Sequence, residues 1–162
     1  MPSELDRAFD RIMDALTAPG APLETQMLSR GNHDVPVLKN APATLRDFFA
    51  HYCTQHADLT FLVDGHLRLS FAEVHALAVQ VAGGLAERHG IRKGDRVAIA
   101  ARNSANWIIA YMAVIMAGGC ATLINAWCVA EEMVGAIRMV DCRLVIADPQ
   151  RAARREGADI GC

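Results

Sequence analysis

The sequence has few of the features that mark disulfide-stabilised, zinc-binding or nucleic-acid-binding proteins. Its 162 residues include five cysteines, an odd number, and no Cys-X-X-Cys pair, so neither a disulfide framework nor a zinc ribbon is indicated. Charged residues make up 21% and the formal net charge is −2, so no basic excess points to nucleic acid or to an anionic membrane. The first 18 residues carry six charges and no uninterrupted apolar run, unlike a secretory signal. We therefore expect reduced thiols and a cytoplasmic location.

Two small nucleotide- or signal-binding folds are also disfavoured. The dinucleotide-binding pattern Gly-X-Gly-X-X-Gly is absent, and a receiver domain needs several acidic residues at strand ends, where only Asp148 is found. Residues 107–124 carry no charge, but Gly118 and Gly119 interrupt them, so we predict a buried helix, a glycine break and a buried strand rather than a membrane span. Apolar residues amount to 52%, which is enough for a hydrophobic core and excludes a largely disordered chain.

The first predicted region spans residues 1–42. Ser3 is a suitable helix N-cap with Asp6 three positions later, and an apolar helical stripe follows. The stripe consists of Leu5, Phe9, Ile12, Met13 and Leu16. Residues 19–42 hold repeated prolines and little periodicity, so we predict an extended arm or linker there.

The second predicted region spans residues 43–162 and begins with a helix. Two short β-prone runs then flank Asp64-Gly65, a dipeptide that is typical of a hairpin turn. Ser70 and Glu73 have the spacing of a capping box, and the apolar periodicity behind them predicts a long amphipathic helix.

From position 96 onward, apolar strands and helices alternate. Strands are predicted at 96–101, 120–124 and 144–147, with helices at 104–117 and 129–140. Because the strands are largely apolar rather than alternating, they indicate an α/β fold with a parallel sheet covered on both faces and right-handed crossovers. No further element is predicted after the third strand. We therefore expect an incomplete subdomain that self-associates through the open edge of its sheet.

Five segments of the second region together resemble the adenylate-forming ligases, which comprise acyl-CoA synthetases, luciferases and peptide-synthetase adenylation domains. They are similar to the family patterns LTYAEL, GVxxGDRVAI, PNSxEW, KAGAVxVPLN and EELxYxLxxSxAxxVxxD, in the same order. A variant Asn125-Ala126-Trp127, in place of the commoner Asn-Pro, resembles bacterial fatty-acyl or aryl-CoA synthetases. The five segments are 69–73 (Leu-Ser-Phe-Ala-Glu), 90–99 (Gly-Ile-Arg-Lys-Gly-Asp-Arg-Val-Ala-Ile), 102–107 (Arg-Asn-Ser-Ala-Asn-Trp), 116–125 (Met-Ala-Gly-Gly-Cys-Ala-Thr-Leu-Ile-Asn) and 143–148 (Arg-Leu-Val-Ile-Ala-Asp) with Glu131 and Glu132 before it.

The resemblance implies an enzyme that activates a carboxylic acid, here expected to be a fatty acid. ATP, with Mg2+, would give an acyl-adenylate and pyrophosphate, and CoA would then take the acyl group. Such chemistry needs a phosphate-binding loop rich in Ser, Thr and Gly that ends in Pro-Lys, and this sequence has none. No catalytic, cofactor-binding or metal-binding residue is therefore assigned. We expect a truncated N-terminal portion of an AMP-binding acyl-CoA synthetase that is inactive by itself. The alternative is a free-standing α/β interaction or nucleotide-binding module.

The remaining clusters of reactive residues have plainer interpretations. His51, Cys53 and His56 could form a metal site, but residues five apart on a helix point about 140° apart, which favours a surface cluster. Cys120 and Cys142 fall near predicted strands and are expected to be inert core thiols. The other assignments are a solvated helix face, rather than a phosphate site, for Arg151, Arg154 and Arg155, and core packing for Met112, Met116, Met133 and Met139.

Overall fold

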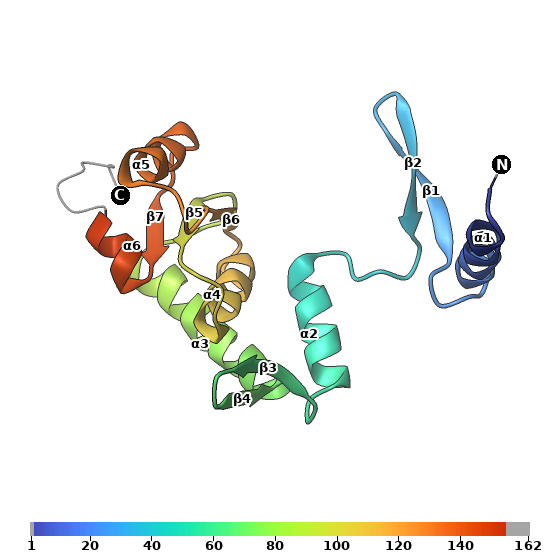
Figure 1. Cartoon of the computed structure of the whole chain (residues 1–162), viewed down its shortest axis with the longest axis horizontal. Helices are drawn as coiled ribbons and strands as arrows, with labels where there is room; N and C mark the ends of the chain where they lie inside the picture. The colour runs from blue at the N-terminus through green and yellow to red at the C-terminus, as the bar shows by residue number, and fades with distance from the viewer. Residues whose placement is uncertain (1, 155–162) are drawn as a thin grey trace. The chain divides into compact units, whose positions relative to one another are not determined.

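The computed structural model describes residues 2–154 of the 162-residue chain (Figure 1). The chain divides into two compact units, Met1–Ala43 and Thr44–Cys162. The predicted domain division into residues 1–42 and 43–162 stays a prediction.

The first unit holds one helix and one hairpin. Helix α1 (Glu4–Thr17) begins at the predicted capping box, because the Ser3 hydroxyl accepts from the Asp6 amide and the Asp6 carboxylate accepts from the Ser3 amide. No residue of α1 is buried, and Leu5, Phe9 and Ile12 of its apolar stripe are each more than half exposed.

The extended arm predicted for residues 19–42 is wrong, because this segment contains an antiparallel hairpin of β1 (Thr25–Arg30) and β2 (His33–Leu38). Gly31 begins its two-residue loop with φ 60, a backbone conformation that glycine adopts without strain. Pro36 interrupted the strand pattern in the sequence. In a two-stranded sheet both strands are edge strands, where proline is tolerated.

The second unit begins as predicted. Helix α2 (Leu45–Gln55) is followed by the hairpin of β3 (Thr60–Asp64) and β4 (Leu67–Ser70), and the Ser70 capping box begins α3 (Phe71–Arg88). The Asp64 carboxylate also accepts a hydrogen bond from the Ala105 amide at 2.9 Å, which ties the hairpin to the start of the next helix.

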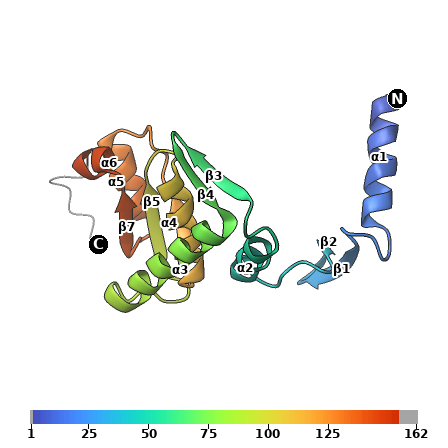
Figure 2. The same ribbon diagram turned by 90° about the horizontal axis from the view of Figure 1, so that it is seen from below.

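The parallel sheet predicted from position 96 onward is confirmed. Its strands are β5 (Arg96–Ala100), β6 (Cys120–Leu123) and β7 (Leu144–Ala147), in the spatial order β6-β5-β7, and Figure 2 shows β5 and β7 side by side. Three helices alternate with the strands, namely α4 (Ala105–Met116), α5 (Ala130–Met139) and α6 (Pro149–Arg154). The segment 107–124 is a helix, a glycine break and a strand, and no helix among the described residues is long and apolar enough to cross a membrane.

Alternate residues of the central strand β5 face opposite layers of helices. Val97 and Ile99 pack with residues of α3 and α4, whereas Ala98 and Ala100 pack with residues of α5. All four are fully buried, as expected for a strand covered on both faces. The β5–α4–β6 and β6–α5–β7 crossovers run in opposite directions across the sheet and use opposite faces, so both have the same hand.

Two predictions about the core are wrong. Cys120 is exposed, because β6 has a strand on one side only among the described residues. Met139 is 85% exposed on the outer side of α5. In contrast, Cys142 is buried as expected. Met112 and Met133 are buried in the core as predicted, and Met116 packs against it.

Gly83 and Gly119 differ in what surrounds them, and alanine substitutions at these two positions test the difference. A Cβ on Gly83, in the middle of α3, would meet no atom within 4 Å, whereas one on Gly119 would lie 3.1 Å from Val114 Cγ1 and 3.3 Å from the Asp95 carbonyl oxygen. Gly83→Ala is expected to raise the free energy of unfolding by about 1 kcal/mol, because alanine favours helix.

The matched variant Gly119→Ala is expected to lower the free energy of unfolding by about 1–3 kcal/mol, because the added methyl group overpacks a close contact. Urea denaturation of both variants measures the two changes. A Gly83→Ala variant less stable than the parent chain would show that this surface of α3 is covered in solution.

Candidate binding edge of the parallel sheet

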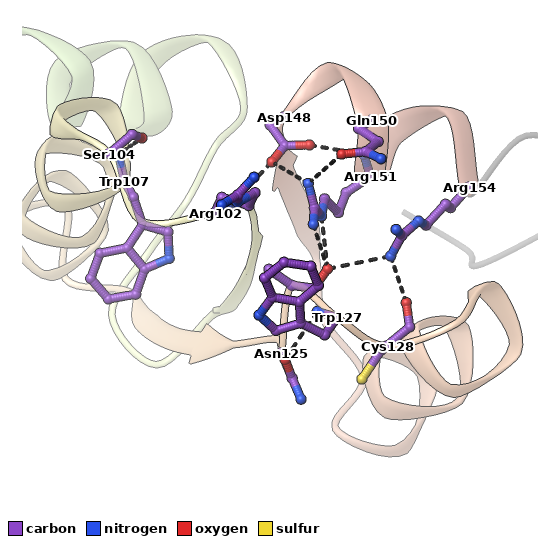
Figure 3. Close-up of polar contacts among 11 residues, drawn as sticks. Arg102, Ser104, Trp107, Asn125, Trp127, Cys128, Asp148, Gln150, Arg151 and Arg154 are labelled. Atoms are coloured by element: carbon purple, nitrogen blue, oxygen red, sulfur yellow. Dashed lines mark hydrogen bonds and ion pairs between the residues drawn. The ribbon is translucent and has the colours of Figure 1, made fainter. Parts of the chain in front are cut away.

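The carboxyl ends of the three parallel strands lie at one edge of the sheet, where open α/β sheets bind ligands. The loop after β5 leads to α4 on one face, and the loop after β6 leads to α5 on the other. Such a change of direction between neighbouring strands opens a crevice. Figure 3 shows the polar residues that gather at this edge.

Asp148, which follows β7 directly, joins two of the three strand ends. Its Oδ2 accepts from the Arg102 amide, just beyond β5, at 3.0 Å, and its Oδ1 accepts from the Arg151 amide at 2.9 Å. The Arg151 guanidinium forms an ion pair with the same carboxylate at 3.2 Å.

These contacts change the acidity of Asp148. Desolvation raises the pKa of Asp148, but the hydrogen bonds from the Arg151 and Arg102 amides and the positive charge of Arg151 together outweigh it. The pKa therefore lies below its ordinary value of 3.8, and the carboxylate is ionised at neutral pH.

A pH titration of stability tests the role of this carboxylate. Since the folded pKa of Asp148 is lower than the unfolded value, ionised Asp148 stabilises the folded chain above the unfolded pKa, and this contribution is lost as pH falls through the folded pKa. Asp148→Asn is expected to lower the free energy of unfolding by about 1–3 kcal/mol at neutral pH, a deficit that shrinks as pH falls from about 5 through the lowered folded pKa. Urea denaturation across this range measures the deficit.

The matched control is Asp141→Asn. Asp141 forms an ion pair with Arg96 at the opposite edge of the sheet, and its side chain is 93% exposed. A surface pair of this kind contributes about 0–1 kcal/mol, so this variant should stay close to the parent chain at every pH. A deficit in Asp148→Asn that is independent of pH would contradict the assignment.

The solvated helix face predicted for Arg151 and Arg154 is wrong. Arg151 is 2% exposed, and both its Nε and its Nη2 donate to the Ala126 carbonyl oxygen, at 2.9 and 2.7 Å. Arg154 Nη1 donates to the same oxygen at 3.3 Å and to the Cys128 carbonyl oxygen at 2.7 Å. The arginines face inward because the loop after β6 presents carbonyl groups that have no strand to pair with. Arg155 lies outside the described residues.

Trp127 stands in this loop and is 72% exposed. The Arg102 guanidinium lies over its ring, with Cζ at 5.2 Å from the ring centroid. An exposed cation–π contact of this type contributes about 0.5–1 kcal/mol. The edge therefore presents a large aromatic surface and a cation side by side.

A cavity of about 320 Å3 lies next to this cluster, between the ends of β5 and β7. Its wall is mostly apolar and includes Trp107, whose ring stacks on Tyr111 with centroids 5.8 Å apart. The polar groups on the wall are Ser104, Asn106 and Asp148. A cavity of this size and lining suits the apolar part of a small molecule.

The surface cluster predicted for His51, Cys53 and His56 is wrong for Cys53, which is 5% exposed. Cys53 is buried between α2, α3 and α4, and burial raises the pKa of its thiol. The rings of His51 and His56 both lie next to Tyr52. Within residues 2–154, no group of three or more potential metal ligands comes together.

The sequence alone assigns no residue to this edge and places Arg151 and Arg154 on a solvated helix face rather than against the loop after β6. Asp148 was noted only as an acidic residue after a strand, and Trp127 only as a variation in a family pattern. A signal was present, because Arg151 follows Asp148 by three positions and Arg154 follows Arg151 by three, about one helical turn each. That spacing places them on one face, but it does not say whether the face meets solvent or a loop.

Comparison with known proteins agrees with the fold and the motifs. Residues 49–160 match the family described as AMP-binding enzyme. The chain belongs to this family. Among relatives, 4-coumarate–CoA ligase-like 3 of Oryza sativa subsp. japonica is 35% identical over 86 residues, which cover 53% of this chain and 15% of that protein. The medium/long-chain-fatty-acid–CoA ligase FadD6 of Mycobacterium tuberculosis is 28% identical over 109 residues, which cover 67% of this chain and 18% of that protein.

Solved structures of the AMP-binding family show the same arrangement. The N-terminal domain of FACL13 from Mycobacterium tuberculosis superposes with a TM-score of 0.67 and 26% identity, over 73% of this chain and 31% of that chain. The predicted resemblance to adenylate-forming acyl-CoA ligases and the predicted α/β fold are both confirmed. The matched region spans less than a fifth of the length of the two curated relatives named above.

Proposed function

We propose that this chain forms the scaffold of an acid–CoA ligase that activates a fatty acid with ATP and Mg2+ through an acyl-adenylate. The observation that supports the proposal is the AMP-binding family match over residues 49–160, together with relatives that are CoA ligases. Nothing in the chain resembles the phosphate-binding loop of the family. We therefore propose that the 162-residue chain is inactive by itself.

The cationic edge of the sheet is proposed to contact an adenine nucleotide, which both ATP and CoA contain. Arg102, Arg151 and Arg154 against one carboxylate, Asp148, give this cluster a formal charge of +2, in a chain whose net charge is −2. Guanidinium groups bind phosphate, and the exposed Arg102 is available for this contact, whereas Arg151 is 2% exposed and adds only its charge. An exposed tryptophan such as Trp127 stacks on a base for about 1–3 kcal/mol. The Arg102 guanidinium and the Trp127 ring lie side by side, so one nucleotide could place its phosphate on the first and its base on the second.

The test of activity is ATP-dependent pyrophosphate release with a panel of fatty and aromatic acids, with and without CoA. It is run on the purified chain and on any longer product of its gene. Turnover by the longer product alone supports the proposal, and the active panel member names the acid. Turnover by the 162-residue chain would contradict its inactivity. No turnover by either favours the free-standing binding module.

The nucleotide contact is tested by titrating the chain with CoA, ATP and adenosine while the indole signals of its two tryptophans are recorded by NMR. We expect the Trp127 signal to shift with CoA or ATP and not with adenosine at the same concentration, because the phosphates supply the attraction to Arg102. The nucleotide that acts at the lower concentration is the one that this edge binds more tightly. Unchanged signals with both nucleotides would contradict the contact.

Self-association through the free edge of β6 is also proposed. Within the described residues β6 pairs on one side only, and its Leu123 is 53% exposed, so a second copy could extend the sheet. Light scattering over a range of concentrations tests this proposal. A monomer at the highest concentration would contradict it.

A further inference from the structure

The peptide unit between Ala126 and Trp127 is held at both of its polar ends. Its carbonyl oxygen receives three side-chain hydrogen bonds, two from Arg151 and one from Arg154. Its amide, on the opposite edge of the same plane, donates to Asn125 Oδ1 at 3.0 Å. Because a peptide unit is planar, fixing both ends fixes the direction in which the chain enters Trp127.

Arg102, which lies over the Trp127 ring, is held in place by the ion pair between Asp148 and Arg151. Asp148 accepts from the Arg102 amide, so it holds the backbone from which the Arg102 side chain extends. Arg151 Nη1 donates to Asp148 while Nε and Nη2 of the same guanidinium donate to Ala126. One buried arginine and one carboxylate therefore link the ends of β5, β6 and β7 (Figure 3).

We propose that Asp148 and Arg151 are positioning residues that hold Arg102 and Trp127 in the geometry that receives the ligand. This inference rests on the proposed contact between Trp127 and an adenine nucleotide. Neither positioning residue needs to touch the nucleotide for this role.

The exposure of Trp127 distinguishes this positioning role of Asp148 and Arg151 from ordinary core packing. Trp127 is 72% exposed, so apolar burial does not fix its position, and the polar contacts of the loop must do so. A stack that is ordered before binding loses less conformational entropy when the ligand arrives. Losing this order is expected to weaken nucleotide binding about three- to tenfold, and in an active longer product of the gene the effect should lie in KM rather than in kcat.

Arg151→Lys is the decisive variant, because lysine keeps the positive charge and removes the planar fork that reaches Ala126 and Asp148 together. We expect the Trp127 indole signal to broaden and shift in the free variant, while the Trp107 signal stays in place. Arg143→Lys is the matched control. Arg143 pairs with Asp95 at the opposite edge, so both indole signals should remain unchanged.

The outcomes distinguish this inference from the proposed function. A mobile Trp127 with unchanged nucleotide affinity supports positioning and contradicts the nucleotide contact. An unchanged Trp127 signal in Arg151→Lys overturns positioning, whatever the affinity. If Arg151→Lys fails to fold, shown by loss of the Trp107 signal, Asn125→Ala replaces it, because this exposed side chain holds the other end of the same peptide unit. An unchanged Trp127 signal in that variant overturns the inference equally.

Discussion

Replacing Arg151 by methionine is expected to lower the free energy of unfolding by about 3–5 kcal/mol. The methionine fills a similar space but donates no hydrogen bond, so the Ala126 carbonyl loses two of its donors and Asp148 loses its ion pair. Because the guanidinium is 2% exposed, water does not replace these contacts without opening the edge of the sheet. Urea denaturation of the variant and the parent chain measures the change.

Arg143→Met is the control for this prediction. Arg143 also forms an ion pair, with Asp95 at 3.1 Å, but its side chain is 51% exposed. A surface pair contributes about 0–1 kcal/mol, so this variant should remain near the parent chain. If Arg151→Met also loses less than about 1 kcal/mol, the desolvation of Arg151 cancels its hydrogen bonds, and the linking role described for it is wrong.

Truncation of Ile99 to alanine is the second large effect, with an expected loss of about 2–5 kcal/mol in the free energy of unfolding. Ile99 is fully buried at the centre of β5 and packs within the cluster formed with α3 and α4. The lost methyl and methylene groups leave a cavity that the flanking helices fill only in part. Thermal and urea denaturation both report the loss.

Leu123→Ala is the matched variant, because Leu123 is paired in register with Ile99 across the same sheet. Its side chain is 53% exposed, so the expected loss is less than about 1 kcal/mol. Equal losses in the two variants would show that the outer edge of β6 is covered in solution. That result would support self-association through this edge.

Periodicity and local signals in the sequence predicted most of the second unit. Ser70 with Glu73 begins α3 as expected, and Asp64-Gly65 lies at the turn of the β3–β4 hairpin. These predictions succeed because a cap or a tight turn depends on residues within one turn of each other. The hairpin at residues 25–38 was missed because Pro36 and weak alternation hide a two-stranded sheet from periodicity.

The candidate site could not be predicted in the same way. The Arg151–Ala126 contact joins residues 25 positions apart, and the Arg102–Asp148 contact joins residues 46 positions apart. Neither pair has a fixed spacing that a single sequence reveals. The same holds for Cys120 and Met139, whose exposure depends on which strand is at the edge of the sheet and on which face of α5 meets the core.

The sequence by itself determined the α/β class, the parallel strands, the helix caps and the membership of the AMP-binding family, because these depend on short-range patterns and on ordered motifs. Only the tertiary structure decided that Arg151 points inward and that Asp148 links two strand ends. The physical reason is that a carbonyl left unpaired by one loop attracts donors from any element that folds against it. Sequence spacing does not predict this contact, whereas the packing of α6 against the loop after β6 produces it.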